Sequence, residues 1–317
     1  MRALLSVLLG VLLVSTVFAA GPVEVIDKEF SQVVSGRAKL VTIGADFEFT
    51  EGPVWIAKKG KERGHLLFSD IPADKIYRWG PKEKLTVFRE PSGKSNGLLV
   101  GPRGGLLACE HWNRRVTQTL GGGTVISLCD YYLRKPLNSP NDIAIGPDKT
   151  LWFTDPPYGL EGREQIQENC NVFVFGQAWG EPKVAVSDFN RPNGIVFSPD
   201  KSVVYVADSG KPHHVRSFKV ITDTTVTPAA YGVDDGKVFC VITPGGPDGM
   251  AVDVDGRLYV TAGDGVQVFR ADGKLIGKIL TPKVPANCCF GGDDMKTLYM
   301  TAREAVYSIK LKVVGLP

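Results

Sequence analysis

The sequence predicts an all-β fold, a six-bladed β-propeller. A short phrase led by Asn, Asp or Glu recurs six times, and each copy opens a strand, a tight turn and a second strand. Successive copies start about 40 to 55 residues apart, which is the period of a four-stranded propeller blade. Six repeats of this length therefore predict six blades.

The repeats follow the same order of residues along the chain. They begin at Glu51-Gly52-Pro53, Asn96-Gly97-Leu98, Asn141-Asp142-Ile143, Asn193-Gly194-Ile195, Asp248-Gly249-Met250 and, more loosely, Asn287-Cys288-Cys289. Most continue through alternating apolar residues to a polar turn, at residues 101–104, 146–149, 198–201, 254–257 and 292–295. A second apolar strand follows the turn, as at residues 151–155 and 203–208.

This arrangement predicts where the polar lead residues meet. In a propeller the first strand of every blade lies against the central channel, so the six lead residues form one ring at one mouth. The second strand of an antiparallel hairpin returns to the same face. We therefore expect an outer shell around the ring, made by Asp70, Glu110 with His111, Asp155 and Asp208.

Residues 1–19 have the layout of a secretory signal peptide, with Arg2, an apolar run over residues 4–13 and small residues ending at Ala19. The alternative is a membrane anchor or a buried strand, but the apolar run is short for spanning a bilayer. Residues 20–317 contain no linker, which predicts a single propeller domain. We expect a periplasmic or secreted protein that has no membrane attachment after cleavage.

The composition narrows the classes of partner. The formal net charge is +3 and the basic residues are scattered, so nucleic-acid binding has little support. Six cysteines in an exported chain would permit a disulfide framework. However, Cys109, Cys129 and Cys240 fall in or beside apolar strand-like stretches, where buried free thiols are common. We favour free thiols.

Four ring residues carry the chemistry of a metal site: Glu51, Asn141, Asn193 and Asp248. Two carboxylates balance the charge of a divalent cation, and carboxylate and amide oxygens suit a hard ion such as calcium, magnesium or manganese. Without a cation, like charges at close range repel and raise each other's pKa. The polar ring therefore predicts a divalent metal.

A simpler interpretation treats these phrases as ordinary turn dipeptides that introduce strands. Two features weigh against it. The six copies are in register, and Pro140, Pro192 and Pro247 each stand directly before a ring residue. A proline fixes its own φ and pushes the preceding residue toward extended geometry, which stiffens the approach to the ring.

Other catalytic schemes have less support. The chain has no Gly-x-Ser-x-Gly elbow, and its four histidines do not have metal-ligand spacing. Of these, only His111 ends a second strand at the predicted mouth. His111 is either a substrate-contacting or proton-handling residue or an ordinary loop residue.

Several segments together resemble a known family: Thr50-Glu51-Gly52-Pro53, residues 107–115, Ser139-Pro140-Asn141-Asp142, residues 153–159, Arg191-Pro192-Asn193-Gly194 and Pro247-Asp248-Gly249-Met250. In these segments the chain resembles the gluconolactonase and regucalcin (senescence marker protein) family of six-bladed propellers, and most of all its bacterial gluconolactonase branch. The resemblance extends over residues 45–305.

The resemblance implies one catalytic divalent metal ion, with Ca²⁺ as first choice and Mg²⁺, Mn²⁺, Zn²⁺ or Fe²⁺ as alternatives. Positions Glu51, Asn193 and Asp248 would bind it, and Asn141 would complete the shell or hold the substrate. The implied reaction is hydrolysis of a sugar lactone, such as glucono-1,5-lactone to gluconate. Asp248 would also be the general base.

Supporting roles follow for two further groups. Asn96, Asn141, His111 and Tyr158 are candidates for contacts to the substrate, and Asp142, Asp155 and Asp208 for orienting ligands or water. Asp155 and Asp208 would fit equally well as structural acceptors for loop amides. Ser139 stands where the animal branch carries an arginine, so the substrate recognition of that branch does not transfer.

Two alternatives to the lactonase stay open. One is an esterase or phosphotriesterase on the same scaffold, because metal activation of water serves any polarised carbonyl or phosphoryl group. The other is a ligand-binding propeller with a structural metal. A complete metal shell favours binding, and an open coordination position favours hydrolysis.

Overall fold

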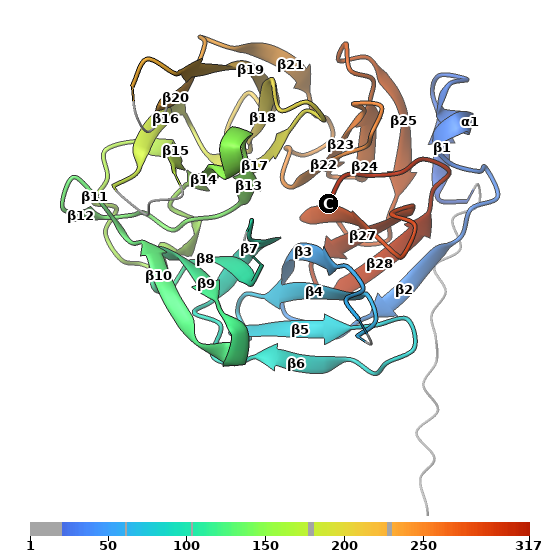
Figure 1. The fold of residues 1–317 in the computed structure, drawn as a ribbon. Coiled ribbons are helices and arrows are strands. Elements are labelled where there is room, and N and C mark those ends of the chain that lie inside the picture. The colour runs from blue at the N-terminus through green and yellow to red at the C-terminus, as the bar shows by residue number, and fades with distance from the viewer. Residues whose placement is uncertain (1–20, 61, 103, 177–180, 227–229) are drawn as a thin grey trace, which may run out of the picture.

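The computed structural model describes residues 21–60, 62–102, 104–176, 181–226 and 230–317. Six of its sheets are arranged as blades around a central channel, with the first strand of each blade nearest the axis (Figure 1). The predicted six-bladed β-propeller is confirmed. The predicted signal peptide over residues 1–19 lies outside the described residues.

The first three blades each contain four antiparallel strands in sequence order. The first has β3 (Thr50–Ile56), β4 (His65–Asp70), β5 (Lys75–Trp79) and β6 (Thr86–Arg89). The second has β7 (Ser95–Val100), β8 (Leu106–Glu110), β9 (Arg115–Thr119) and β10 (Val125–Cys129). The third has β13 (Ile143–Ile145), β14 (Leu151–Asp155), β15 (Cys170–Phe175) and β16 (Lys183–Phe189).

The fourth and fifth blades each have five strands, and the sixth blade is completed by a strand from the N-terminal segment. The fourth has β17 (Pro192–Phe197), β18 (Val203–Asp208), β19 (His214–Asp223) and β21 (Lys237–Val241), and β20 (Ala230–Val233) pairs with the far half of β19. The fifth has β22 (Met250–Val252), β23 (Leu258–Ala262), β24 (Gly265–Phe269), β25 (Leu275–Leu280) and β1 (Val23–Val25). The sixth has β26 (Asn287–Gly291), β27 (Thr297–Ala302), β28 (Ala305–Lys310) and β2 (Leu40–Gly44).

Few elements lie outside the blades in the described ranges. They are the hairpin of β11 (Tyr131–Tyr132) and β12 (Lys135–Pro136), the helix α1 (Phe30–Val33) and 3₁₀ turns at Gly121–Gly123, Pro147–Lys149 and Tyr158–Leu160. Within these ranges no helix is long and apolar enough to cross a membrane.

The N-terminal segment closes the ring. Strand β2 pairs with β28, with Leu40 opposite Ile309, so the sixth blade combines strands from both ends of the chain. Strand β1 adds a fifth strand to the fifth blade through β25. The ring of blades is therefore closed by pairings between residues more than two hundred positions apart.

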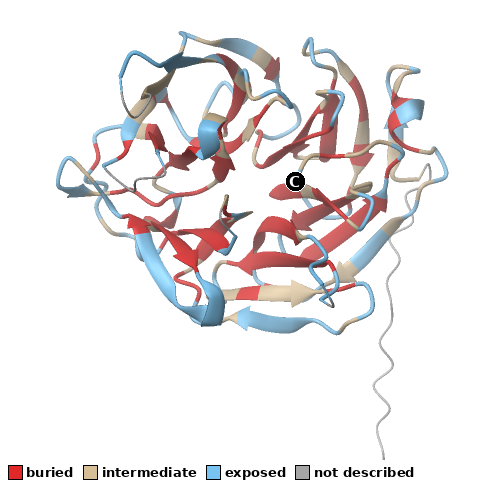
Figure 2. Ribbon diagram, viewed as in Figure 1, coloured by how far each residue is buried: buried red, intermediate tan, exposed pale blue. Residues whose placement is uncertain are grey.

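The apolar core lies between neighbouring blades. Because side chains alternate across a strand, one strand serves two interfaces. In β14, Phe153 packs toward the second blade and Trp152 toward the fourth. The middle strands are buried, whereas an outermost strand such as β6 is mostly exposed (Figure 2).

The six cysteines form no disulfide. Cys109, Cys129, Cys240 and Cys288 are buried, and Cys170 and Cys289 are partly exposed. The expectation of free thiols is confirmed. Burial raises the pKa of the Cys129 and Cys240 thiols to about 12, so these thiols stay protonated near neutral pH.

Phe30 in α1 anchors the N-terminal segment to the propeller. Its side chain is fully buried in the core between the fifth and sixth blades, against Gly277, where a Cβ would lie 2.1 Å from the Phe30 ring. We expect Phe30→Ala to lower the free energy of unfolding by about 3–5 kcal/mol, the usual cost of an aromatic-to-alanine cavity. Denaturant unfolding measures this, and a loss below about 1 kcal/mol would contradict the anchoring role.

Candidate active site at the mouth of the channel

The lead residues of the repeats lie at one end of the inner strands. Glu51, Asn96 and Asn193 are the second residues of β3, β7 and β17, and Asn287 is the first residue of β26. Asn141 and Asp248 stand two residues before β13 and β22. Since neighbouring inner strands contact one another around the circle, these six residues form the predicted ring.

Glycines after the lead residues allow the inner strands to converge. A Cβ at Gly52 would lie 1.9 Å from the carbonyl oxygen of Asn96 in the next blade. A Cβ at Gly194 would lie 2.4 Å from the carbonyl oxygen of Asp248, which accepts the Gly194 N–H at 3.2 Å. Both glycines lie inside strands, so the turn-dipeptide interpretation is wrong for Asn193-Gly194. They are present because the ring narrows at the mouth.

Two ring carboxyls share the site, and a third lies beside it. Burial and the neighbouring Asp142 carboxylate raise the pKa of Glu51 to about 7. Burial, Glu51 and Asp142 together raise the pKa of Asp248 well above its usual value. Burial also raises the pKa of Asp142 to about 6. The protein alone therefore does not compensate the negative charge that these carboxyls would carry when ionised.

Asp248 differs from the other ring residues in its exposure. Of the six, it alone is partly exposed, whereas Glu51 is only 3% exposed. Its buried Oδ1 atom has no hydrogen-bond partner. An unpartnered buried carboxylate oxygen is costly, and a bound cation is one of the partners that removes the cost.

The donor set fits a hard divalent cation. No three His, Cys, Asp or Glu side chains in the described ranges converge to hold a metal by themselves. A cation between Glu51 and Asp248 would therefore take its remaining ligands from amide oxygens of the ring, the mixture that calcium and magnesium accept. Asn141 and Asn193, both buried members of the ring, would supply them.

Asn287 links the carboxyls. Its amide hydrogen-bonds with the carboxyls of both Glu51 and Asp142, and these bonds oppose the burial effect on the pKa of each. Its own Oδ1 accepts the Cys288 N–H at 2.8 Å. The sequence places Asn287 in the ring as the lead residue of the sixth repeat but does not indicate its bonds to the two carboxyls.

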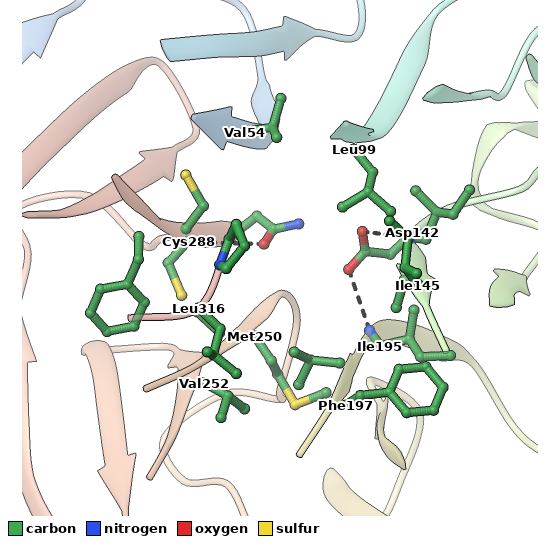
Figure 3. Close-up of a pocket in the computed structure, with 18 of the residues that line it drawn as sticks. Val54, Leu99, Asp142, Ile145, Ile195, Phe197, Met250, Val252, Cys288 and Leu316 are labelled. Atoms are coloured by element: carbon green, nitrogen blue, oxygen red, sulfur yellow. Dashed lines mark hydrogen bonds between the residues drawn. The ribbon is translucent and has the colours of Figure 1, made fainter. Parts of the chain in front are cut away.

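Asp142 joins the third and fourth blades. Its Oδ1 accepts the Ile143 N–H at 2.9 Å and its Oδ2 accepts the Ile195 N–H at 3.3 Å (Figure 3). These bonds orient the carboxylate toward the backbone of the inner strands. Asp142 therefore fixes the spacing between β13, which follows Asn141, and β17, which contains Asn193.

A cavity of about 300 Å³ lies in the central channel next to Asp142 and Asn287 (Figure 3). Most of its lining is apolar and comes from the inner strands, including Val54, Ile195 and Met250. Leu316 and Pro317 at the C-terminal end of the chain also line it. The polar ring thus borders an apolar channel.

The outer-shell aspartates hold loops. Asp208 accepts the backbone N–H groups of Asn190 and Arg191 at 3.0 and 2.8 Å. Asp155 accepts the N–H of Asn138 at 2.8 Å, and Asp70 accepts those of residues 48 and 49. For Asp155 and Asp208 these bonds match the structural role that the sequence left open. Each carboxylate fixes the loop that leads into a ring residue.

The shell residues Glu110 and His111 face different partners. Glu110 is buried and pairs with Arg89 at 2.9 Å and Arg115 at 2.8 Å. The Nε2 atom of His111 lies 3.4 Å from the Nδ2 atom of Asn96. Burial, together with the charge of Arg163, lowers the pKa of His111 to about 4, so the imidazole is neutral near pH 7.

Tyr158 stands above the ring on the loop that follows β14. Its side chain is 40% exposed, and its phenol hydrogen-bonds with Ser209 and Asn193. The Arg191 guanidinium lies 5.3 Å from the centre of its ring. The loop itself packs on the neighbouring blade, because a Cβ at Gly159 would lie 2.3 Å from the Cβ of His111. Gly159, the neighbour of Tyr158 in the chain, thus lies against His111, one of the four predicted substrate-contacting residues.

Comparisons with known proteins agree with this geometry. Residues 49–304 match the family model described as the SMP-30/gluconolactonase/LRE-like region. A gluconolactonase of Zymomonas mobilis is 30% identical, with 93% of this chain and 87% of that protein covered. A regucalcin of Xenopus laevis is 28% identical, with 82% and 85% covered.

A solved structure gives the same result. A gluconolactonase of Xanthomonas campestris superposes with a TM-score of 0.84 at 27% identity, covering 92% of this chain and 96% of that one. Family match, sequence identity and fold therefore agree. The chain belongs to the SMP-30/gluconolactonase/LRE-like family.

Proposed function

We propose that this protein hydrolyses a sugar lactone, such as glucono-1,5-lactone to gluconate, with one divalent cation held at the ring. The observation that carries the proposal is the pair of carboxyls Glu51 and Asp248 at the mouth of a channel, where burial and the Glu51 carboxylate raise the pKa of Asp248. Family membership and the gluconolactonase relatives support the reaction class.

Glu51, Asn141, Asn193 and Asp248 would hold the cation, and calcium is our first choice. Two carboxylates and amide oxygens are ligands that calcium prefers, and calcium accepts irregular geometry. When bound, the cation supplies positive charge that keeps both carboxylates ionised and polarises the lactone carbonyl. Mg²⁺, Mn²⁺, Zn²⁺ and Fe²⁺ are the alternatives.

Asp248 is suited to be the general base. Its partial exposure leaves the carboxylate accessible to a water molecule, from which it would accept a proton. The water oxygen then bonds to the carbonyl carbon, and the ring C–O bond breaks. The departing ring oxygen takes up a proton and becomes the hydroxyl of the open-chain acid.

The residues above the ring would bind the sugar hydroxyls. A neutral His111 imidazole, the Asn96 amide and the Tyr158 phenol offer both donors and acceptors without a net charge. Because a lactone is uncharged, such a surface suits the substrate. Asn141 would serve either the cation or the substrate.

A panel of substrates separates this proposal from its alternatives. We expect pH-stat assays with added calcium to show fast hydrolysis of aldonolactones and little turnover of simple aryl esters or phosphotriesters. Faster turnover of the aryl ester or phosphotriester would favour the esterase interpretation. Tight lactone binding with no turnover under any cation would favour a binding propeller.

We also propose that the protein is exported to the periplasm or beyond after removal of residues 1–19. The charged start, short apolar run and small residues before position 20 support this. N-terminal sequencing of protein recovered from the exported fraction should begin at Ala20. Full-length protein that begins at Met1 in the cytoplasmic fraction would contradict it.

A further inference from the structure

We propose that Ser209 is a positioning residue for the cation site: its hydroxyl fixes which end of the Asn193 amide faces the centre of the ring. It also secures the backbone next to Asp248. This inference rests on the proposed function, because it concerns the same cation. Ser209 directly follows Asp208, the last residue of β18.

The hydrogen bonds determine the orientation of the amide. The Ser209 Oγ atom lies 2.6 Å from the carbonyl oxygen of Pro247 and 2.9 Å from the Nδ2 atom of Asn193. A serine hydroxyl has one proton, and a carbonyl can only accept. The proton therefore goes to Pro247, and the hydroxyl oxygen must accept from Asn193.

This requirement excludes the flipped amide. With Oδ1 facing Ser209, two oxygen lone pairs would meet without a proton between them. The NH₂ group of Asn193 therefore faces Ser209, which leaves Oδ1 at the other end of the planar amide. An amide oxygen, not an amide nitrogen, is what a hard cation accepts.

The same hydroxyl holds the segment before Asp248. Among the described residues no backbone N–H donates to the Pro247 carbonyl, so Ser209 is its hydrogen-bond donor. The next residue is tied by the Gly194 N–H, which donates to the Asp248 carbonyl at 3.2 Å. The ring segments of the fourth and fifth blades are thus joined at two consecutive positions.

Ser209 is itself held in place. Its N–H donates to the Arg191 carbonyl at 3.0 Å, and the following Gly210 N–H donates to Asp208 at 2.9 Å. Its hydroxyl therefore starts from a fixed backbone. The phenol of Tyr158 also hydrogen-bonds with Ser209. Ser209 therefore contacts both a proposed substrate-binding residue, Tyr158, and a proposed cation ligand, Asn193.

The test measures calcium affinity rather than activity. Chelator-stripped protein is titrated with calcium by calorimetry as the wild type, Ser209→Ala and the control Ser202→Ala, whose hydroxyl lies in an exposed turn. We expect Ser209→Ala to weaken calcium binding by about 10- to 100-fold, the usual effect of losing a residue that orients a ligand. The control should bind as the wild type does.

A pair of isosteric variants covers the case in which alanine disturbs folding. Ser209→Thr keeps the hydroxyl and Ser209→Val replaces it with a methyl group, so added bulk affects both equally. We expect the Thr variant to bind calcium at least about tenfold more tightly than the Val variant. Equal affinities in that pair, or wild-type affinity in Ser209→Ala, would overturn the inference for Ser209 alone. A wild type that binds no divalent cation would instead overturn the proposed function.

Discussion

Asp248→Asn should reduce the hydrolysis of glucono-1,5-lactone by about 10²- to 10⁴-fold or more, because an amide cannot take the proton from water. The variant also removes one negative charge from the pair with Glu51, so cation affinity should fall with the rate. Initial rates in a pH-stat, corrected for spontaneous hydrolysis, measure the effect. Saturating calcium should not restore the rate.

Glu51→Gln is the informative comparison. Glu51 is buried and would act only as a ligand, so excess calcium should recover part of the rate in this variant. The control for Asp248→Asn is Asp130→Asn, which makes the same substitution at an exposed position after β10 and should not change the rate of hydrolysis. Full activity in Asp248→Asn would remove Asp248 from the mechanism.

The second large effect concerns stability. We expect calcium at about 100 times its dissociation constant to stabilise the wild type by about 2.7 kcal/mol, since it binds the folded chain only. For a domain of this size that raises the melting temperature by roughly 4 °C. The physical reason is the carboxyl pair, whose repulsion and desolvation the cation relieves.

The same reasoning predicts the opposite behaviour for the neutralised variant. Without a cation, Asp248→Asn should melt above the wild type, because one buried charge is gone. With calcium it should gain little. Thermal unfolding of both proteins, each in chelator and in calcium, gives the four melting temperatures to be compared. An equal calcium-induced shift in both proteins would contradict a site built on Asp248.

The repeat made the blades and the ring predictable. Each lead phrase combines a polar residue with a small or conformationally restricted neighbour. The polar side chain belongs to the ring, and the neighbour allows the inner strands to approach closely at the same point. The closure of the ring was not predictable, because β1 and β2 carry no lead phrase and pair with residues far along the chain. Such non-local pairing leaves no periodic signal in a sequence.

The site was predictable in its ring residues but not in the residues that orient them. Glu51 and Asp248 stand out because two carboxylates in register on one axis are costly. Ser209 and Asn287 act through side-chain hydrogen bonds to residues distant in the sequence, such as Pro247 and Glu51. Asp155 and Asp208 were also predictable at the mouth, but their carboxylates accept hydrogen bonds from backbone N–H groups of loops.

One measurement tests the central claim most directly: turnover of glucono-1,5-lactone by purified wild-type protein, first stripped with chelator and then supplied with calcium. We expect the stripped protein to match the spontaneous rate and calcium to restore fast hydrolysis. Full activity after removal of all divalent cations, or no acceleration with any of them, would contradict a cation-dependent lactonase.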